Sequence, residues 1–312
     1  MSKALWVLGE ALMDCVAQSD GSLRPFMGGS PFNMARAAAL RGARVGYLNP
    51  LSNDHFGTQM REQLLQDGVQ ILSPPSRLPT SLAVVQLTNG QPSYGFYREG
   101  IADRDYSAES VLQKLASSTP GVLHAGSLLL VPPEHDKVIT ILKGAKSLGW
   151  TISVDVNLRP KLATDLEQYV SAVKAVAALA DWLKASDEDL EVLGFAHASR
   201  DNATGIANHF TAQGVSRVAL TFGAQGAWLA VDGADAQQDA PPIQLVDTVG
   251  AGDTFWGNCL ADWTLQPEGA ASRIHTTLRQ AMLAAAINCG RSGCQPPKMD
   301  ELLAADAPVV SQ

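Results

Sequence analysis

The chain has 312 residues, of which 46% are hydrophobic, and a formal net charge of −8 at pH 7. This composition is sufficient for a large buried core, and the length allows one large domain or two. Lysine and arginine are scattered along an acidic chain rather than clustered, so we expect neither nucleic acid nor an anionic membrane surface as a partner.

The four cysteines and six histidines are also dispersed. No Cys-x-x-Cys or His-x-x-x-His spacing occurs, which argues against a structural zinc site and favours buried free thiols. The apolar stretch at the start is short and contains Glu10 and Asp14, so we expect no secretory signal peptide. No stretch approaches the roughly 20 apolar residues of a membrane span. These features predict a cytoplasmic protein.

The first part of the chain alternates between strand-like and helix-like runs. The stretch ALWVLGEALMD predicts a strand running toward Asp14. In SPFNMARAAALRG we expect a helix with Ser30 as N-cap, Pro31 as first helical residue and Gly42 as the stop. ARVGYLNPL then predicts a strand, and FGTQMREQLLQDG predicts a helix that ends at Gly68.

The same alternation continues toward the C-terminus. Strands are predicted at GVLHAGSLLL, TISVDVNL, DWLKAS and SRVALTFG, with helices at HDKVITILKGAKSLG, LEQYVSAVKAVAALA and from Asp187 to Leu193. This order is typical of a parallel sheet covered by helices on both faces. Because no internal repeat or long linker interrupts it, we predict a single α/β domain over residues 1–312.

One region breaks the alternation. Residues 80–98, TSLAVVQLTNGQPSYGFYR, contain two strand-like runs on either side of NGQPS, which is a hairpin signal. Together with residues from about 14 to 27, they predict a small antiparallel sheet beside the main one. We call this small sheet the flap; a lid or a dimer surface is one interpretation, and an ordinary edge hairpin is the other.

Residues 247–257, DTVGAGDTFWG, place glycines directly before a helix-like run. In one interpretation Asp253 simply caps that helix. In the other, the N–H groups from Gly250 to Asp253 and the helix dipole form a cradle for a phosphate. Asp253 would then take a proton from the group that attacks the phosphate. The stretch alone does not decide between them.

Polar residues also follow several of the predicted strands. Glu10 and Asp14 come at the end of the first strand, where carboxylates suit a polyol, and the Asn33 amide can bind hydroxyls. Arg159 in DVNLRP can hold phosphate oxygens. LTFGAQGAW, residues 220–228, suits one wall of a nucleotide site. The P-loop pattern and G-x-G-x-x-G are both absent.

Two of these stretches, GGSPFNMA and DTVGAGDTF, resemble the paired signatures of the ribokinase-like (PfkB) family of carbohydrate kinases. The resemblance is colinear over nearly the whole chain. Between the signatures, LSNDHFG resembles the family's G-x-D-x-F-G segment, and the Gly-x-x-Gly of LTFGAQGAW falls where the family binds nucleotide. It implies an ATP-dependent sugar kinase with a ribokinase-like, mostly parallel sheet, helices on both faces and a small antiparallel β flap.

The resemblance also implies roles for individual residues. Asp253 would be the general base that deprotonates a sugar hydroxyl, while the backbone of Gly250, Ala251 and Gly252 stabilises the transferred phosphoryl group. Mg²⁺ would bridge the phosphates, largely through water. The other implied sites are sugar-binding residues Asp14, Gly29, Asn33, Arg98 and Arg159; nucleotide-binding residues Ser186, Thr221, Gly223 and Gly226; and a monovalent-cation site, suited to K⁺, at Asp247 and the Val249 carbonyl.

Within the family, FYREGIADRDYS and DVNLRP resemble the fructokinases, and Ser127 stands where a ribokinase carries Glu. This implies phosphorylation of D-fructose to fructose 6-phosphate, by a homodimer formed through the flap. The alternatives are 2-keto-3-deoxygluconate, ribose or a riboside as substrate, or a catalytically silent sugar-binding protein. The family's N-x-x-E is replaced by Ser186 and Asp189, which leaves open whether Asp189 or Glu188 is the acid associated with magnesium.

Overall fold

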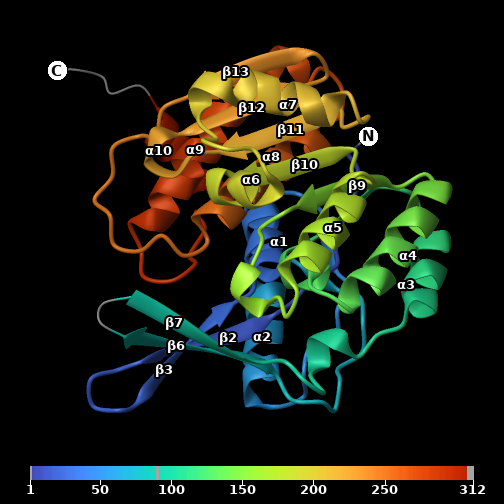
Figure 1. Ribbon diagram of the computed structural model, residues 1–312, viewed down its shortest axis with the longest axis vertical. Coiled ribbons are helices and arrows are strands. Elements are labelled where there is room, and N and C mark those ends of the chain that lie inside the picture. Colours follow the sequence, from blue (N-terminus) through green and yellow to red (C-terminus); the bar gives the residue numbers. More distant parts are fainter. Residues whose placement is uncertain (1, 89–90, 308–312) are drawn as a thin grey trace.

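The computed structural model describes residues 2–88 and 91–307. Within them, nine strands form one sheet in the order β13–β12–β11–β10–β9–β8–β1–β4–β5 (Figure 1). Neighbours from β5 to β11 are parallel, and β12 and β13 extend the sheet antiparallel. The strands are β1 (Leu5–Val7), β4 (Val45–Tyr47), β5 (Gln70–Ile71), β8 (Val122–Gly126), β9 (Thr151–Asp155), β10 (Trp182–Ser186), β11 (Arg217–Thr221), β12 (Ala227–Val231) and β13 (Ala234–Gln238). The predicted, mostly parallel sheet is confirmed.

Helices cover both faces of this sheet, as predicted, and each face has its own hydrophobic cluster. One face carries α1 (Ser30–Leu40), α2 (His55–Gln66), α8 (Ala251–Leu265) and α9 (Ile274–Cys289), with α10 (Met299–Asp306) packed against α9. The other face carries α3 (Ala108–Ala116), α4 (Glu134–Ser147), α5 (Leu166–Ala177), α6 (Asp187–Leu193) and α7 (Ala203–Thr211). Strands buried on both faces need apolar residues throughout, and every residue of β8 is buried. No helix in the described ranges is long and apolar enough to cross a membrane.

The flap is a second sheet that projects from the main body (Figure 1). Its four strands, in the order β3–β2–β6–β7, are β2 (Leu12–Ala17), β3 (Leu23–Gly28), β6 (Ser81–Thr88) and β7 (Gln91–Tyr97). The β2–β3 and β6–β7 hairpins are antiparallel, as expected. The hairpins meet through β2 and β6, which run parallel, so the central pairing differs from the prediction. Residues 89–90 of the predicted NGQPS turn lie outside the described residues.

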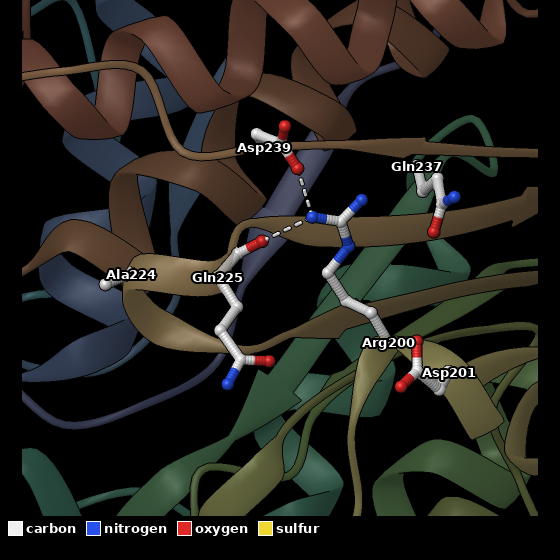
Figure 2. Close-up of a pocket in the computed structure, with 6 residues that line it drawn as sticks. All are labelled: Arg200, Asp201, Ala224, Gln225, Gln237 and Asp239. Carbon is white, nitrogen blue, oxygen red and sulfur yellow. Dashed lines mark hydrogen bonds and ion pairs between the residues drawn. The ribbon is translucent and has the colours of Figure 1, made fainter.

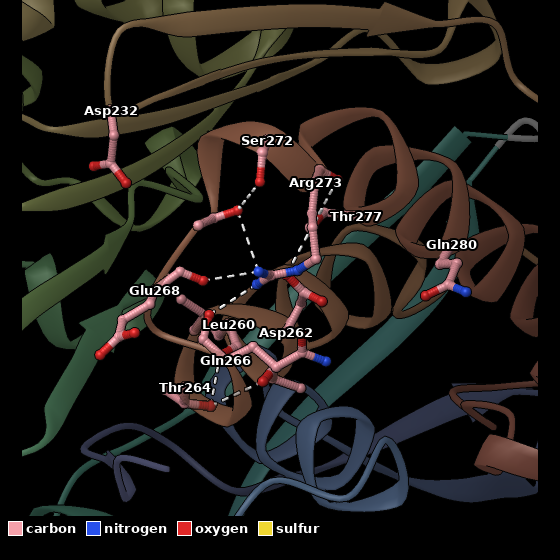
Figure 3. A network of polar contacts seen from close by, with 12 residues as sticks. Asp232, Leu260, Asp262, Thr264, Gln266, Glu268, Ser272, Arg273, Thr277 and Gln280 are labelled. Atoms are coloured by element: carbon pink, nitrogen blue, oxygen red, sulfur yellow. Dashed lines mark hydrogen bonds and ion pairs between the residues drawn. The ribbon is translucent and has the colours of Figure 1, made fainter. Parts of the chain in front are cut away.

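A polar network fixes the C-terminal end of α8 against α9 (Figure 3). Arg273 Nη2 donates to Gln266 O at 2.8 Å and to Asp262 Oδ2 at 3.3 Å, while Nη1 donates to Glu268 O at 2.8 Å. Thr277 Oγ1, on α9, also donates to Asp262 Oδ2, at 2.9 Å. The connection between the two helices is therefore held by charged and polar groups.

Candidate active site

Asp253 lies in the first turn of α8 and does not cap that helix. The residue at the N-cap position is Gly250, in the left-handed conformation with φ of 75°, and no side chain within residues 2–88 and 91–307 caps the helix. The Asp253 carboxylate points instead toward α1: Oδ1 accepts from Ser30 Oγ at 2.6 Å and Oδ2 accepts from Asn33 Nδ2 at 2.9 Å. Among the described residues, no side chain accepts from the N-terminal N–H groups of α8, although the Ala251 N–H donates to the Thr248 carbonyl at 3.2 Å. The carboxylate is held by two donors from another helix.

The structure corrects the predicted start of α1. Ser30 is not the N-cap, because the helix begins at Ser30 and Gly29 takes the cap position with φ of 103°. A Cβ on Gly29 would lie 2.5 Å from the backbone oxygen of Glu10, so glycine is required for both conformation and space. The Ser30 hydroxyl is free to bind Asp253 because it does not cap its own helix.

Asp14 and Asp253 share one electrostatic environment with Arg159. Burial raises the pKa of Asp253 above its usual value, although hydrogen bonds from Ser30 and Asn33 oppose the shift. Burial also raises the pKa of Asp14, to about 6, while the charge of Arg159 lowers it and that of Asp253 raises it. Three of the residues predicted to bind substrate or to act on it are therefore close enough to influence one another's ionisation.

A buried ion pair that sequence reasoning missed lies behind the first turn of α8. Lys184 Nζ, on β10, donates to both carboxylate oxygens of Asp155, at the end of β9, at 2.9 Å each. The residues are 4% and 2% exposed, and a Cβ built on Gly252 would lie 3.5 Å from Lys184 Nζ. A lysine inside the otherwise apolar stretch DWLKAS was the available signal, because lysine is rarely buried without a partner.

The same ion pair keeps a positive charge at this position. Burial alone would lower the pKa of Lys184, but the carboxylates of Asp155, Asp189 and Asp253 raise it overall, so the amine stays protonated. Burial raises the pKa of Asp155 to about 6, against the lowering effect of Lys184. The first turn of α8 therefore has both backbone N–H groups and a buried cation beside it.

Arg98 faces inward from the end of β7. Its Nη2 forms an ion pair with Asp103 Oδ2 at 3.1 Å, and both side chains are buried. Arg98 Nε and Nη1, Asp103 Oδ1 and Glu10 Oε2 are buried without a hydrogen-bond partner in the described part of the chain. Burial raises the pKa of Glu10 to about 7, while the charge of Arg98 lowers it. Buried polar atoms without protein partners are rare in native proteins, which makes this cluster a candidate for contact with a ligand.

Arg159 differs from Arg98 because it is exposed, and its side chain donates to the neighbouring residues Asn157 and Leu158, while its backbone N–H donates to the Tyr169 hydroxyl at 3.1 Å. Its Nη1 donates to Asn157 Oδ1 at 2.6 Å and to Leu158 O at 2.9 Å. No ion pair of Arg159 occurs within the described residues, although its charge influences Asp14. Arg159 is therefore a cation that a ligand at this edge of the site could bind.

The residues predicted to bind nucleotide gather at the ends of two neighbouring strands. Ser186 on β10 and Thr221 on β11 are register partners at the carboxyl ends of those strands. Gly223 and Gly226 follow β11 with φ of 52° and 101°, and a Cβ on Gly226 would lie 2.0 Å from Gln238 O. Four predicted residues are thus brought together at the edge where open α/β sheets bind ligands.

Asp189 forms the capping box at the N-terminus of α6 together with Ser186, and both of its carboxylate oxygens are hydrogen-bonded within the protein. Its Oδ2 accepts from the Ser186 backbone N–H and hydroxyl, each at 2.8 Å, and its Oδ1 accepts from Leu158 N at 2.7 Å. Glu188, beside it, is exposed. No group of three His, Cys, Asp or Glu side chains placed to hold a metal ion occurs among the described residues. Neither acid is part of a preformed protein cage for magnesium.

A hollow of about 430 Å³ adjoins the glycine turn after β11 (Figure 2). Arg200 extends into it, donates from Nη1 to Gln225 O at 2.8 Å and pairs with Asp239. The lining residues are Arg200, Asp201, Ala224, Gln225, Gln237 and Asp239. Because none of the residues around Asp253 lines it, this hollow is separate from the carboxylate centre.

The predicted cation ligands bind protein N–H groups. Asp247 Oδ1 accepts from Val249 N at 3.0 Å and Oδ2 accepts from Gly293 N at 2.8 Å. The Val249 carbonyl accepts from Asn288 Nδ2 at 2.8 Å. Asn288 was not singled out by sequence reasoning.

Comparison with known proteins places this geometry in a family. The chain matches the family described as pfkB family carbohydrate kinase over residues 2–301. It is 31% identical over 259 residues to a fructokinase of Rhizobium leguminosarum bv. trifolii, with 81% of this chain and 77% of the relative covered. It is 28% identical over 241 residues to a 2-dehydro-3-deoxygluconokinase of Bacillus subtilis (strain 168), with 73% and 71% covered.

Solved structures agree with this assignment. The fructokinase of Xylella fastidiosa with bound ATP has a TM-score of 0.81 and 26% identity, covering 97% of this chain and 98% of its own. The fructokinase of Vibrio cholerae O395 with bound fructose, ADP and calcium ion has a TM-score of 0.81 and 25% identity, covering 97% and 99%. Together with the family match over nearly all residues, these likenesses show that the chain belongs to the pfkB family of carbohydrate kinases.

Proposed function

We propose that this kinase transfers the γ-phosphoryl group of ATP to a primary hydroxyl of D-fructose, giving fructose 6-phosphate, with Asp253 as general base. The observation that carries the proposal is the Asp253 carboxylate, buried and held by Ser30 and Asn33 beside an uncapped helix N-terminus. A base and an anion site are thus side by side, as in-line phosphoryl transfer requires.

The hydrogen bonds around Asp253 suit it to accept a proton. They fix the position of both carboxylate oxygens, each of which keeps a lone pair for a substrate hydroxyl. Burial raises the pKa of Asp253, which makes the carboxylate a stronger base than an exposed aspartate. A helix N-terminus favours the ionised form and so opposes the effect of burial.

The first turn of α8 would hold the phosphoryl group. The backbone N–H groups around Gly250, Ala251 and Gly252 present partial positive charge, and in the described part of the chain no side chain caps them, although the Ala251 N–H also donates to the Thr248 carbonyl. The buried Lys184 ammonium lies behind Gly252 and adds a full charge. Preorganised donors of this kind stabilise charge that develops in the transition state.

The nucleotide would lie along the edge formed by Ser186, Thr221, Gly223 and Gly226, next to that turn. Glycines with positive φ allow the backbone to approach phosphates closely. The absence of a three-carboxylate cluster among the described residues fits Mg²⁺ held mainly by phosphate oxygens and water. When bound, Mg²⁺ would neutralise phosphate charge.

The sugar would lie against Asp14, Gly29 and Asn33. Asn33 uses its Nδ2 for Asp253, and its Oδ1 is buried without a partner in the described residues, so it is an acceptor available to a hydroxyl. The Asp14 carboxylate, whose pKa is about 6, is mainly ionised at neutral pH and can accept hydroxyl hydrogen bonds. These groups match a polyol.

The charges favour a neutral sugar over an acidic one. Arg98 is already paired with Asp103 and lies near Glu10, so its charge is balanced within the protein. The names of the fructokinase relatives support the same substrate. The second candidate, 2-keto-3-deoxygluconate, is favoured by the exposed, unpaired Arg159, which could bind a carboxylate, and by the Bacillus subtilis relative.

The flap would close over the sugar and pair between two subunits. It projects from the body, and Leu23 and Tyr97 on its strands are 49% and 64% exposed, which is apolar surface suited to a partner. We place the reaction in the cytoplasm, where ATP is present and the four free cysteines stay reduced.

A coupled assay of ADP release over a panel of sugars tests the proposal. The panel contains D-fructose, ribose, an aminoimidazole or purine riboside, glucose and 2-keto-3-deoxygluconate. Fructose-dependent ADP release, absent with Asp253→Asn, is the expected result. If no sugar of the panel supports ADP release, but calorimetry shows that the protein binds one of them, the protein is a silent sugar-binding protein.

A further inference from the structure

The segment leading into the first turn of α8 is hydrogen-bonded to the last residue of α9 and to the loop that follows it. Val246 N and Asp247 N both donate to the Cys289 carbonyl, at 2.9 and 3.1 Å. Asp247 Oδ2 accepts from Gly293 N at 2.8 Å, on the loop after α9. These contacts fix the position of the backbone just before Gly250.

Asn288 completes this connection with a fully determined side chain. It is completely buried, its Nδ2 donates to Val249 O at 2.8 Å and its Oδ1 accepts from Gln295 N at 2.7 Å. Because a backbone N–H can only donate and a carbonyl can only accept, the amide orientation is fixed by its two partners. The N–H of Asn288 therefore faces the Val249 carbonyl.

The position of this loop is transmitted directly to the phosphate cradle. Gly250 lies against Cys294, since a Cβ on Gly250 would be 2.2 Å from Cys294 Sγ. Val249 immediately precedes Gly250, so the Asn288 hydrogen bond acts on the residue that leads into the turn. A shift of this loop would displace the N–H groups that are proposed to hold the phosphoryl group.

The residues present do not fit a monovalent cation in this place. The resemblance to the ribokinase-like family implies one at Asp247 and the Val249 carbonyl. Here the carbonyl faces an amide donor and Asp247 Oδ2 faces the Gly293 N–H, so partial positive charge of the protein already lies against both oxygens.

We propose that Asn288 replaces the monovalent cation, linking the two loops that a cation would bridge, so that turnover of this kinase does not depend on K⁺. The proposal rests on the proposed kinase function. The side-chain amide replaces the charge of the ion, because its N–H places partial positive charge against the Val249 carbonyl. Its carbonyl accepts from Gln295 N and so holds the loop after α9.

The test compares the wild type with Asn288→Asp in K⁺ and in tetramethylammonium at equal ionic strength. The change keeps the size and the Gln295 acceptor but puts an oxygen where the N–H donor was. If K⁺ has no site in the wild type, it cannot change the fraction of protein in the active conformation. Wild-type kcat should therefore differ less than about twofold between the two salts. Asn288→Asp should be at least about tenfold slower in tetramethylammonium and recover in K⁺, as a newly made cation site would be filled by mass action.

Asn258→Asp is the matched control. Asn258 is also buried, and its Nδ2 also donates to a backbone carbonyl, that of Thr254 at 2.9 Å, within α8. The same chemical change there should show no difference between the two salts. A response to K⁺ at Asn258→Asp equal to that at Asn288→Asp would overturn the proposal, since the effect would not belong to this loop.

Thermal unfolding in the two salts provides a readout that needs no sugar. K⁺ should raise the Tm of Asn288→Asp more than that of the wild type. If no sugar is phosphorylated, the kinase proposal fails while this comparison still decides the role of Asn288. Strong K⁺ activation of the wild type, or an Asn288→Asp protein whose Tm and turnover ignore K⁺, contradicts the inference.

Discussion

Ser30 and Asp253 are 223 residues apart in the sequence, yet Ser30 Oγ donates to Asp253 Oδ1 at 2.6 Å. The bond joins the first turns of α1 and α8, which pack against each other. Gly257 permits this packing, because a Cβ there would lie 2.7 Å from the backbone oxygen of Met34. The two glycine-rich stretches that stand out in the sequence therefore lie against each other in the folded chain.

Replacing Asp253 by Asn should lower kcat by roughly 10²–10⁴, the usual contribution of a general base. The substitution is nearly isosteric, and an amide can still bind Ser30 and Asn33, so thermal stability should change little. Steady-state kinetics and a melting curve on the same preparation measure both. Turnover within about threefold of the wild type would show that another group takes the proton.

Asp262→Asn is the matched control for that change, since both aspartates are 8% exposed and belong to α8. Asp262 binds Arg273 and Thr277 at the other end of the helix. Its substitution should reduce the free energy of unfolding by about 2 kcal/mol, because hydrogen bonds to a charged acceptor are weakened. Its kcat should stay at the wild-type value.

Ser30→Ala should move the acid limb of the kcat/KM profile to higher pH. The Ser30 hydroxyl bonds to the ionised form of Asp253 and lowers the pKa of that carboxyl against the raising effect of burial. Without the Ser30 hydroxyl, the effect of burial is less opposed, so the pKa of Asp253 rises further. A profile measured with saturating ATP shows the shift; an unchanged or lowered apparent pKa would mean that Asp253 does not control the limb.

Lys184→Met should destabilise the protein by about 3–5 kcal/mol, because Asp155 would be left as an unpaired buried charge. The double variant Lys184→Met with Asp155→Leu removes both charges and should recover most of that stability. Its kcat should stay well below the wild type, because the cation behind Gly252 is gone. A double variant with wild-type kcat would assign the pair to folding alone.

Glu10→Gln should change how stability depends on pH. The folded pKa of Glu10 is about 7, raised by burial, against an ordinary value of 4.5. Between these two pKa values the folded state retains a proton that the unfolded chain releases. The contribution of the Glu10 carboxyl to the free energy of unfolding is therefore complete below about pH 4.5 and is lost as pH rises through about 7. The wild type should lose roughly 3 kcal/mol relative to Glu10→Gln across this window. Denaturant unfolding of both proteins at several pH values measures it, and parallel curves would contradict it.

Much of the fold follows from local patterns in the sequence. The alternation of strands and helices predicts the parallel sheet with helices on both faces, since apolar strands such as β8 must be covered twice. The flap hairpins are also predicted, from strand-like runs around a turn signal. The parallel pairing of β2 with β6 is not, because it joins segments separated by α1 and α2 and no local pattern encodes it.

The site is predictable in its residue types but not in its contacts. The sequence pattern suggests that Ser30 is an N-cap. Its hydroxyl instead donates to Asp253, because α8 packs against α1. Lys184, Asp155 and Asn288 lie on different elements from their partners or from the groups they influence, so their roles depend on the tertiary structure. Cap and turn rules describe neighbouring residues, and they cannot report such distant contacts.

The central claim is that Asp253 and the residues around it phosphorylate a neutral sugar, fructose. A direct competition tests it: the enzyme receives ATP and equal concentrations of D-fructose and 2-keto-3-deoxygluconate, and the phosphorylated products are quantified. A site with buried polar partners should favour its own sugar by about 10²-fold or more, so fructose 6-phosphate should dominate and should vanish with Asp253→Asn. A dominant phosphorylated keto-acid would contradict the fructose assignment, and a product unaffected by Asp253→Asn would contradict the mechanism.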